Sequence, residues 1–212
     1  LDHVDKNTIL VACMMVNNEV GTRNDVERLA AEVKRRNSRT IVHVDAVQAW
    51  MRVPIKLANI DTLAVSGHKI HAPKGIGALY LSDSLYQAFQ APYLGGEQER
   101  EKRPGTENLY APGARSEEAL NAARAAVART LGCKSRELYF TSCGSESNNM
   151  ALLGAALTRR FGKGIVVSGF EHPSVQKPLE RLAAMGYDVT VVDPGPDGTL
   201  DIDRMLDHVD KK

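Results

Sequence analysis

The feature that most constrains the fold is an alternation of short apolar runs with longer segments of helical period. The apolar runs are rich in β-branched residues, which favour strands. This alternation is typical of a parallel sheet covered by helices on both faces. The predicted strands are Thr8 to Val16, Thr40 to Asp45, Thr62 to Ser66, Gly77 to Leu81, Leu138 to Thr141, Gly164 to Ser168 and Asp188 to Asp193.

Four of the six gaps between these strands contain a predicted helix, and the gaps after Asp45 and Ser66 contain none. Residues Gly95 to Pro112 keep no sustained period and are predicted to form a long loop, a kind of segment that is usually functional in compact domains. The predicted helices are Asn24 to Arg36 with Asn24 as N-cap, Glu117 to Leu131 ended by Gly132, Ser147 to Phe161, and Ser174 to Met185.

Composition predicts one globular domain, because 212 residues with 43% hydrophobic and 25% charged content can bury one sizeable core. The formal net charge is +1 and the basic residues are scattered, so neither nucleic acid nor a membrane is expected as a partner. No run approaches the roughly 20 apolar residues that cross a bilayer, and residues 1–6 lack signal-peptide character.

The cysteines predict reduced thiols. Cys13, Cys133 and Cys143 are odd in number and form no CxxC pair, which argues against a disulfide framework and against structural zinc. We therefore expect a cytoplasmic location and no metal site.

One hexapeptide occurs at both ends of the chain. Leu1 to Lys6 reads Leu-Asp-His-Val-Asp-Lys, and Leu206 to Lys211 reads the same. If the tail copy were laid over the head copy, the chain would continue from it directly into Asn7. The two ends therefore look like copies of one original junction.

Two strand ends carry residues suited to pyridoxal phosphate (PLP). Lys69 lies in Ser66-Gly67-His68-Lys69 after one strand, and Asp45 closes another, with Gln48 just beyond. A lysine can form a Schiff base with the cofactor, and a carboxylate facing the pyridine nitrogen keeps that nitrogen protonated, so that the ring accepts electrons. The alternative for a single lysine after a strand is a solvated end.

The segment Thr141 to Asn149 follows a strand and opens a helix, a place where backbone N–H groups can approach an anion. Gly144 and Ser145 are the predicted phosphate cradle, with Ser66 and His68 as further donors, although small polar residues here could also serve only as a helix cap. Cys143 is interpreted as a small residue that fits the turn, with an activated thiol nucleophile as the alternative.

Two more segments should reach the same carboxyl edge of the sheet. His172, in Glu171-His172-Pro173, could stack on the pyridine ring and move a proton, or could be a structural histidine at a strand end. Asn17-Asn18-Glu19 could place an amide near the phenolic oxygen of the cofactor, or could form a turn.

The motifs together resemble the cysteine desulfurases of iron–sulfur cluster assembly, in the class V aminotransferase group of fold-type I PLP enzymes. This resemblance implies an α/β fold, a three-layer α/β/α sandwich around a mostly parallel seven-stranded sheet. The matching segments are Thr141 to Asn149, Glu171 to Pro173, Val16 to Gly21, His43 to Gln48, Ser66 to Lys69, His71 to Gly75, Gly95 to Arg100 and Arg103 to Asn108.

The resemblance also implies a role for each matching residue. Lys69 would be the Schiff-base lysine, Asp45 would face the pyridine nitrogen, and His172 would stack on the ring. Thr106 would reach the phosphate of a neighbouring subunit, which implies a homodimer, and the substrate would be L-cysteine, converted to L-alanine. The phenolic oxygen would be held by Gln48 and Asn18, and the phosphate by Gly144, Ser145, Ser66 and His68.

The chain departs from the family pattern in two ways. Its halves stand in reversed order, which implies a circularly permuted single PLP-binding domain: residues 1–110 match the second half of the family domain, 111–115 form a new link, and 116–212 match the first half. Nothing resembles the small C-terminal domain that carries the persulfide-forming cysteine and a substrate-binding arginine, nor the N-terminal arm. The sequence therefore predicts PLP binding, with at most slow side reactions.

Two other interpretations stay open at this point. The chain could be a non-catalytic scaffold, natural or engineered, in which the duplicated hexapeptide promotes domain swapping. It could also be another class V enzyme, such as a selenocysteine lyase or an aminotransferase.

Overall fold

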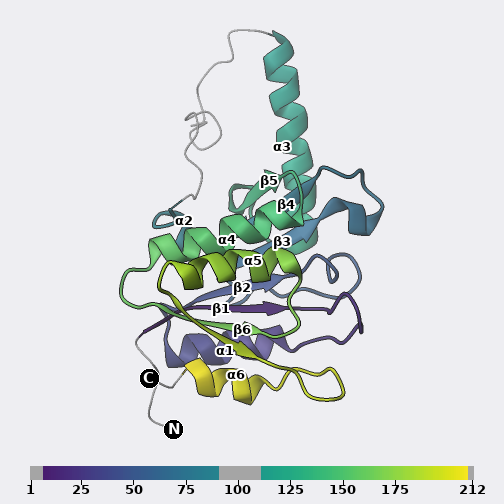
Figure 1. The fold of residues 1–212 in the computed structure, drawn as a ribbon. Coiled ribbons are helices and arrows are strands. Elements are labelled where there is room, and N and C mark those ends of the chain that lie inside the picture. Colours follow the sequence, from purple (N-terminus) through teal and green to yellow (C-terminus); the bar gives the residue numbers. More distant parts are fainter. Residues whose placement is uncertain (1–6, 91–110, 210–212) are drawn as a thin grey trace.

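A single sheet of seven strands forms the centre of the molecule (Figure 1). The computed structural model describes residues 7–90 and 111–209, with side chains from 117 onward in the second range. The strand order is β5-β4-β3-β2-β1-β6-β7. The strands are β1 (Thr8–Met14), β2 (Ile41–Asp45), β3 (Thr62–Ser66), β4 (Gly77–Leu81), β5 (Leu138–Thr141), β6 (Gly164–Ser168) and β7 (Asp188–Val192).

The prediction of a mostly parallel sheet is confirmed. Strands β3, β2, β1, β6 and β7 run parallel to one another, and β4 runs antiparallel to both of its neighbours. The connection between β3 and β4 explains the exception, because it contains only a short 3-10 helix, Gly67–Ile70, and no crossover helix. An antiparallel partner needs only a short connection, whereas a parallel one needs a crossover.

Helices cover both faces of the sheet, which confirms the three-layer α/β/α sandwich (Figure 1). One core unites α1, α3 and α6 with sheet residues such as Val11 and Cys13. The other unites α2, α4 and α5 with Leu10 and Ala12. Neighbouring residues of β1 thus face opposite cores, as the period of a strand requires. The helices are α1 (Val26–Arg36), α2 (Asp83–Tyr86), α3 (Ala111–Leu131), α4 (Gly144–Thr158), α5 (Pro173–Ala184) and α6 (Ile202–Val209).

Several predicted helix boundaries were wrong. The N-cap of α1 is Asp25, whose carboxylate accepts a hydrogen bond from the Arg28 N–H at 3.0 Å, whereas the Asn24 side chain donates to the Met14 carbonyl at 2.7 Å. Helix α4 begins three residues earlier than Ser147, directly at the predicted phosphate turn.

The predicted loop also ends earlier than expected. Residues 111 and 112 belong to α3, so the predicted link 111–115 forms the first turns of a helix. A proline is tolerated there because the first turn leaves its N–H groups unpaired in any case. The rest of the predicted loop, residues 95–110, lies outside the described residues.

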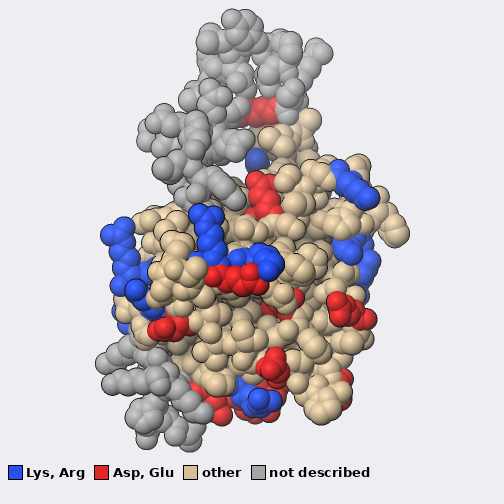
Figure 2. Space-filling model, in the orientation of Figure 1, with Lys and Arg blue, Asp and Glu red and all other residues tan. Residues whose placement is uncertain are grey.

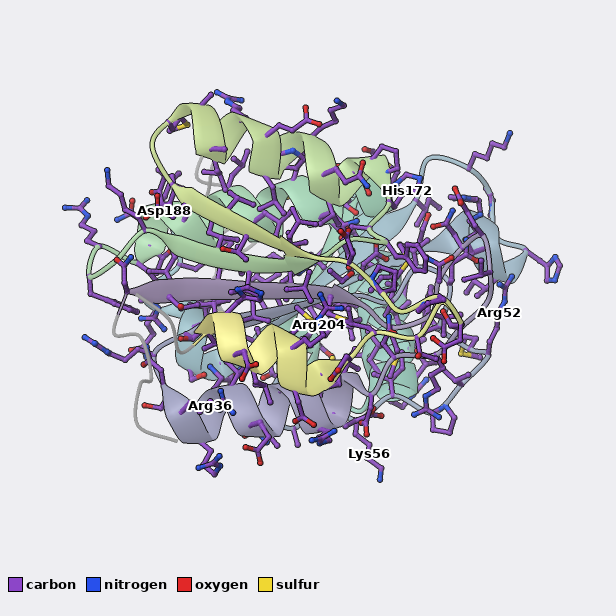
Figure 3. The ribbon with its side chains drawn as sticks, turned by 60° about the horizontal axis from the view of Figure 1, so that its bottom comes forward. Arg36, Arg52, Lys56, His172, Asp188 and Arg204 are labelled. Atoms are coloured by element: carbon purple, nitrogen blue, oxygen red, sulfur yellow. The ribbon has the colours of Figure 1, made fainter. Side chains whose placement is uncertain are left out.

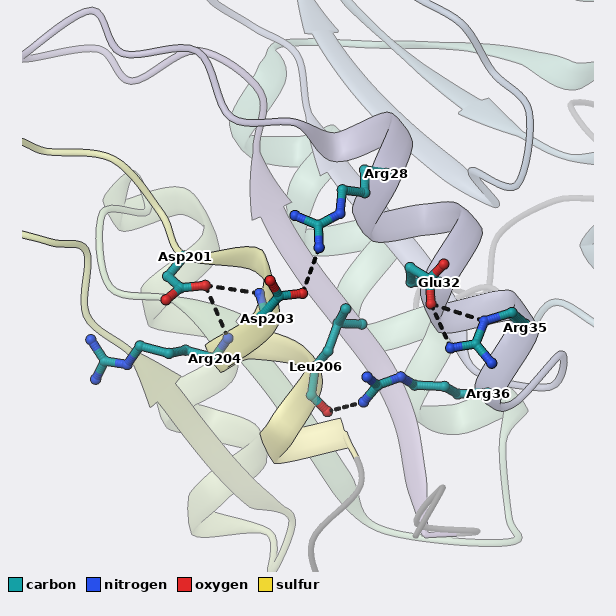
Figure 4. A network of polar contacts seen from close by, with 8 residues as sticks. All are labelled: Arg28, Glu32, Arg35, Arg36, Asp201, Asp203, Arg204 and Leu206. Atoms are coloured by element: carbon teal, nitrogen blue, oxygen red, sulfur yellow. Dashed lines mark hydrogen bonds and ion pairs between the residues drawn. The ribbon is translucent and has the colours of Figure 1, made fainter. Parts of the chain in front are cut away.

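Helix α6 was not predicted, although its apolar residues Ile202, Met205, Leu206 and Val209 follow a helical period and are buried. It packs beside α1, and Figure 4 shows the polar contacts between the two. Arg28 pairs with Asp203 at 2.6 Å, and the Arg36 guanidinium donates to the Leu206 carbonyl at 2.8 Å. The tail copy of the hexapeptide therefore contributes the second half of a packed helix, while the head copy lies outside the described residues.

The surface carries charges of both signs. Figure 2 shows small groups of Lys and Arg with Asp and Glu between them on this face. Among the described residues, no helix combines the length and the apolar character that crossing a bilayer requires.

Candidate functional site at the carboxyl edge of the sheet

A pocket of about 160 Å³ lies where the parallel strands β1, β2, β3 and β6 end. Every predicted site residue within the described ranges lines it, whereas Thr106 lies outside those ranges. Figure 3 shows His172 and Arg52 at this end of the sheet and Asp188, the first residue of β7, at the other. The lining residues are Met14, Asn18, Asp45, Val47, Gln48, Ser66, His68, Lys69, Cys143, Gly144, Ser145, His172 and Ser174.

A larger hollow, of about 370 Å³, lies at the opposite edge of the sheet, against the segment between α4 and β6. It is lined by Arg159, Arg160 and Lys163 among others, and by none of the predicted site residues. The smaller pocket holds the acid, amine and imidazole groups together, so it is the candidate site.

Asp45 is the buried acid of the pocket, with 2% of its surface exposed. Its Oδ1 accepts a hydrogen bond from the Val47 N–H at 2.9 Å, and its Oδ2 accepts one from Asn148 Nδ2 at 2.7 Å. Burial raises the pKa of Asp45, while these two donors and the nearby His172 lower it in part. The carboxylate is thus fixed in direction at the end of β2.

Lys69 lies in the short 3-10 helix directly after β3 and is partly buried. Arg52 fixes this turn from outside, because its guanidinium donates to the Lys69 carbonyl at 2.8 Å and to Gln48 Oε1 at 3.1 Å. Ser66 Oγ and His68 Nδ1 lie 2.8 Å apart on the same turn. The connection between β3 and β4 therefore places an amine, a hydroxyl and an imidazole at one side of the pocket.

The start of α4 forms the opposite side of the pocket. Cys143 is its N-cap residue and has an extended conformation. A Cβ atom at Gly144 would lie 2.7 Å from Val47 Cγ2 and 3.3 Å from Ser66 Cβ. A side chain at this position would push against Val47 and Ser66, so the glycine lets the helix N-terminus come close to both.

Cys143 has a pKa below its ordinary value. Burial raises this pKa, but hydrogen bonds from the backbone N–H groups of Glu146 and Ser145 and from the hydroxyls of Ser142 and Ser145 outweigh that effect. The donors at the start of α4 therefore favour the thiolate form of Cys143 over the thiol.

His172 has a structural role and also lies at the pocket. It is the N-cap of α5, where its Nδ1 accepts a hydrogen bond from the Ser174 N–H at 3.1 Å, and it also lines the pocket. Asn17 forms a turn, because its Oδ1 accepts from the N–H groups of Glu19 and Val20 at 2.8 and 2.9 Å. That turn leaves Asn18, and not Asn17, among the lining residues.

Sequence reasoning missed the residues that hold these groups from behind. Asn148 contacts Asp45, Ser174 and the buried imidazole of His43. Burial lowers the pKa of His43 to about 4, although its hydrogen bond with Asn148 raises it in part. No sequence signal singles these residues out, because they come from α4, α5 and β2 and meet only in the folded chain.

Glu171 is a second buried acid, with 4% of its surface exposed. Its Oε1 accepts hydrogen bonds from the Met14 N–H at 2.5 Å and from the Ser168 hydroxyl. Its pKa is raised to about 8, chiefly by burial and also by the nearby Asp45, although the two hydrogen bonds act to lower it. Glu171 thus joins the ends of β1 and β6 in the same region as Asp45.

The fold and the site define an α/β protein with a lysine, an acid and a histidine at the carboxyl edge of a mostly parallel sheet. The aminotransferase class-V family matches this chain at residues 1–108 and again at 101–212. The chain therefore belongs to that family, and the sequence relatives below are cysteine desulfurases.

Curated relatives match about half of the chain. A cysteine desulfurase of Nostoc sp. is 50% identical over 105 residues, which are 49% of this chain and 25% of the relative. A putative cysteine desulfurase, IscS 1, of Bacillus subtilis is 47% identical over 106 residues, 49% of this chain and 27% of the relative. The chain thus spans about a quarter of the length of these relatives.

Solved structures with lower identity were also found. The apo structure of a cysteine desulfurase from Thermococcus onnurineus NA1 is 29% identical, with a TM-score of 0.38, and the match covers 54% of this chain and 34% of that one. A NifS-like protein is 24% identical, with a TM-score of 0.41, over 84% of this chain and 61% of the other.

Proposed function

We propose that this chain is a PLP-binding domain of the cysteine desulfurase type. The observation that carries the proposal is the convergence of Lys69, Asp45 and His172 on one pocket whose far side is the N-terminus of α4. Its named relatives, all cysteine desulfurases, support the same proposal.

The residues present fit PLP in their chemistry. The cofactor has an anionic phosphate, an aldehyde and a basic ring nitrogen. The pocket offers a helix N-terminus brought close by Gly144, a lysine amine, and a buried carboxylate with a donor on each oxygen. Anion, aldehyde and ring nitrogen each have a matching partner.

Each residue would have a definite task. Gly144, Ser145, Ser66 and His68 would bind the phosphate, and Asp45 would hold the proton of the ring nitrogen. When bound, PLP supplies an electron-accepting ring and an aldehyde that links to amines. Lys69 Nζ would take the α-proton of an amino acid substrate. The ring would also be contacted by His172 on its face and by Gln48 and Asn18 at the phenolic oxygen.

The family substrate, L-cysteine, and its conversion to L-alanine are part of the proposal. Transfer of the sulfur is not expected from the cysteines of this chain. Cys13 and Cys133 do not line the pocket, and Cys143 lies at its phosphate end, where an anion would compete with it. We therefore propose cofactor binding with slow side reactions.

Domain organisation and assembly also belong to the proposal. We propose a single permuted domain, with residues 1–110 and 116–212 as the exchanged halves of the family domain and 111–115 as the link. A homodimer completed by Thr106 of a second copy is proposed from the resemblance alone. The cytoplasmic location and the absence of nucleic acid and membrane partners remain predictions.

A permuted scaffold without catalysis is the second candidate function. The observation that favours it is the duplicated hexapeptide, whose tail copy buries Leu206 and Val209 in α6. If the head copy of a second molecule took that place, two chains would be joined by exchange of identical segments. A size measurement with and without residues 1–6 distinguishes this arrangement from a monomer.

Absorption spectroscopy with added PLP tests the proposed function. We expect a band near the edge of the visible region in the wild-type chain, and its loss in Lys69→Ala. Lys74→Ala is the matched control, because Lys74 is exposed in the same connection and does not line the pocket. Borohydride reduction followed by peptide mass spectrometry should find the cofactor on Lys69. A chain that stays colourless in excess PLP would contradict the proposal.

A further inference from the structure

A continuous series of hydrogen bonds joins Asp45 to His172 through two residues of α4 and α5. Asn148 Nδ2 lies 2.7 Å from Asp45 Oδ2 and 2.9 Å from Ser174 Oγ. Ser174 Oγ in turn lies 2.8 Å from His172 Nδ1. Asn148 is fully buried, so it can reach no solvent partner instead.

We propose that Asn148, oriented by His43, is a positioning residue that couples the direction of Asp45 to the protonation pattern of the His172 ring. The proposal deepens the proposed function and rests on it, since Asp45 and His172 would flank the same cofactor. The proposal states which atom donates and which accepts in each hydrogen bond of the series. We call this assignment the hydrogen order, and it follows from the contacts.

The orientation of the Asn148 amide follows from what its neighbours can accept. An ionised carboxylate only accepts hydrogen bonds, so the amide nitrogen faces Asp45. The amide oxygen then faces His43 Nε2, at 3.1 Å, and that nitrogen must donate. The other ring nitrogen, Nδ1, is left to accept from Thr62 Oγ1 at 2.9 Å.

His43 is suited to act as a fixed donor. Its ring is 1% exposed, and its two partners, Thr62 and Asn148, are uncharged. Burial lowers the pKa of His43 to about 4, so near neutral pH the ring carries one hydrogen, which the contacts place on Nε2. A neutral His43 therefore holds the Asn148 amide in one of its two possible orientations.

At the far end of the series, the backbone N–H and the hydroxyl of Ser174 both face His172 Nδ1. The Ser174 N–H can only donate, and it lies 3.1 Å from His172 Nδ1, so this nitrogen is an acceptor. The neutral His172 ring therefore carries its hydrogen on Nε2. Ser174 Oγ accepts a hydrogen bond from Asn148 Nδ2 and donates one to His172 Nδ1. This second donor also favours the form of the His172 ring with its hydrogen on Nε2.

Nuclear magnetic resonance of the ¹⁵N-labelled histidine rings tests this order directly in the chain without PLP. At a pH where both rings are neutral, we expect the hydrogen on Nε2 in His43 and in His172, with the signals assigned through His172→Gln. A hydrogen on Nδ1 of either ring in the wild-type chain would overturn the proposal, and this measurement needs no destabilising variant.

Substitution tests the coupling. Asn148→Ala should leave the Ser174 hydroxyl free to accept from His172 Nδ1, so that His172 shows a mixture of the two neutral forms. The same change should weaken PLP binding about tenfold, because Asp45 Oδ2 loses its donor. Asn149→Ala is the control, since Asn149 donates only to the backbone carbonyls of Ser145 and Ser174. Ser174→Ala keeps the backbone N–H and removes the hydroxyl, so His172 should keep its hydrogen on Nε2 in this variant. Asn148→Leu, which has a similar size and no amide, replaces Asn148→Ala if that variant does not fold. An unchanged His172 pattern in a folded variant of Asn148 would overturn the coupling.

The two proposals fail separately. If the ring patterns are as expected and no PLP binds, the proposed function is wrong and the hydrogen order is supported. If PLP binds and His172 carries its hydrogen on Nδ1, the hydrogen order is wrong and the proposed function is supported.

Discussion

The cysteines of this chain show how strongly local surroundings set the reactivity of one residue type. Burial raises the pKa of Cys13 well above its ordinary value, and the carboxyl of Glu171 raises it further. Burial also raises the pKa of Cys133 to about 11. For Cys143 burial acts in the same direction, but the hydrogen-bond donors at the start of α4 outweigh it and lower the pKa. Thiolate chemistry should therefore concentrate at Cys143.

Alkylation with iodoacetamide near neutral pH should modify Cys143 first, and Cys13 and Cys133 much more slowly, as peptide mass spectrometry can measure. PLP should slow the reaction at Cys143, because the phosphate would occupy the same helix N-terminus. Cys143→Ser removes the fast site and serves as the control. Equal rates at Cys133 and Cys143 would contradict the argument.

Glu171 should make stability depend on pH. In the unfolded chain its carboxyl loses its proton near 4.5, whereas in the folded chain burial raises the pKa to about 8. Between these values the folded state holds the extra proton, so the contribution of Glu171 to the unfolding free energy is full below pH 4.5 and falls as the pH rises to about 8. The fall should amount to a few kcal/mol, on the order of 1.4 kcal/mol per pKa unit.

Glu171→Gln tests this dependence because the amide stays neutral and keeps an oxygen to accept from the Met14 N–H and the Ser168 hydroxyl. Urea denaturation at pH 5 and pH 8 should show that the variant gains stability relative to the wild type as the pH rises. Glu180→Gln, on the exposed face of α5, should change neither value. A constant difference between variant and wild type would rule out the titration of Glu171 as the cause.

At the scale of elements, the close approach of α4 to β2 and β3 builds the pocket. Gly144→Ala should lower the unfolding free energy by about 1–3 kcal/mol, because the new Cβ would lie 2.7 Å from Val47 Cγ2. The same change should weaken PLP binding, since the helix N-terminus must move away. Ser145→Ala is the control: Ser145 is exposed, so its loss should weaken PLP binding and leave stability unchanged. If Gly144→Ala is as stable as the wild type, the start of α4 does not pack tightly against the residues after β2.

Secondary structure could be predicted where a run of apolar residues or a helical period was clear in the local sequence. All seven predicted strands occur. Strands β1 to β4 are buried along their whole length, whereas the edge strands β5 and β7 are partly exposed. Helix α6 was missed although Ile202, Met205 and Leu206 have helical spacing, since it is only eight residues long and overlaps the repeated hexapeptide. The residues that line the pocket follow strand ends and could be predicted. The supporting contacts of Asn148 and His43 could not, because they depend on how three elements pack.

At the scale of the whole molecule, the described ends lie beside each other. The Val209 carbonyl accepts a hydrogen bond from Thr8 Oγ1 at 3.3 Å. If the tail hexapeptide continued into Asn7, only Asp210 and Lys211 would have to connect Val209 to Asn7. A chain extends about 3.3–3.6 Å per residue, so a connection through these two residues spans up to about 10 Å. The proximity agrees with the proposal that both ends derive from one junction.

A reordered variant tests that proposal. Its chain would run from Ser116 to Lys211, continue directly with Asn7, and end at Tyr110, so that the head hexapeptide, residues 111–115 and Lys212 are left out. Because Thr8 and Val209, on either side of the new connection, already touch, and the opening removes only the first turns of α3, we expect an unchanged circular dichroism spectrum and the same PLP band. The matched control has the same new bond, keeps residues 111–115, and is opened between Ala155 and Ala156. That opening cuts α4 where both residues are buried, so the control should lose its cooperative unfolding transition.

If the reordered variant fails to fold while the present order folds, the order of the halves is itself required, and the two hexapeptides are not interchangeable copies of one junction.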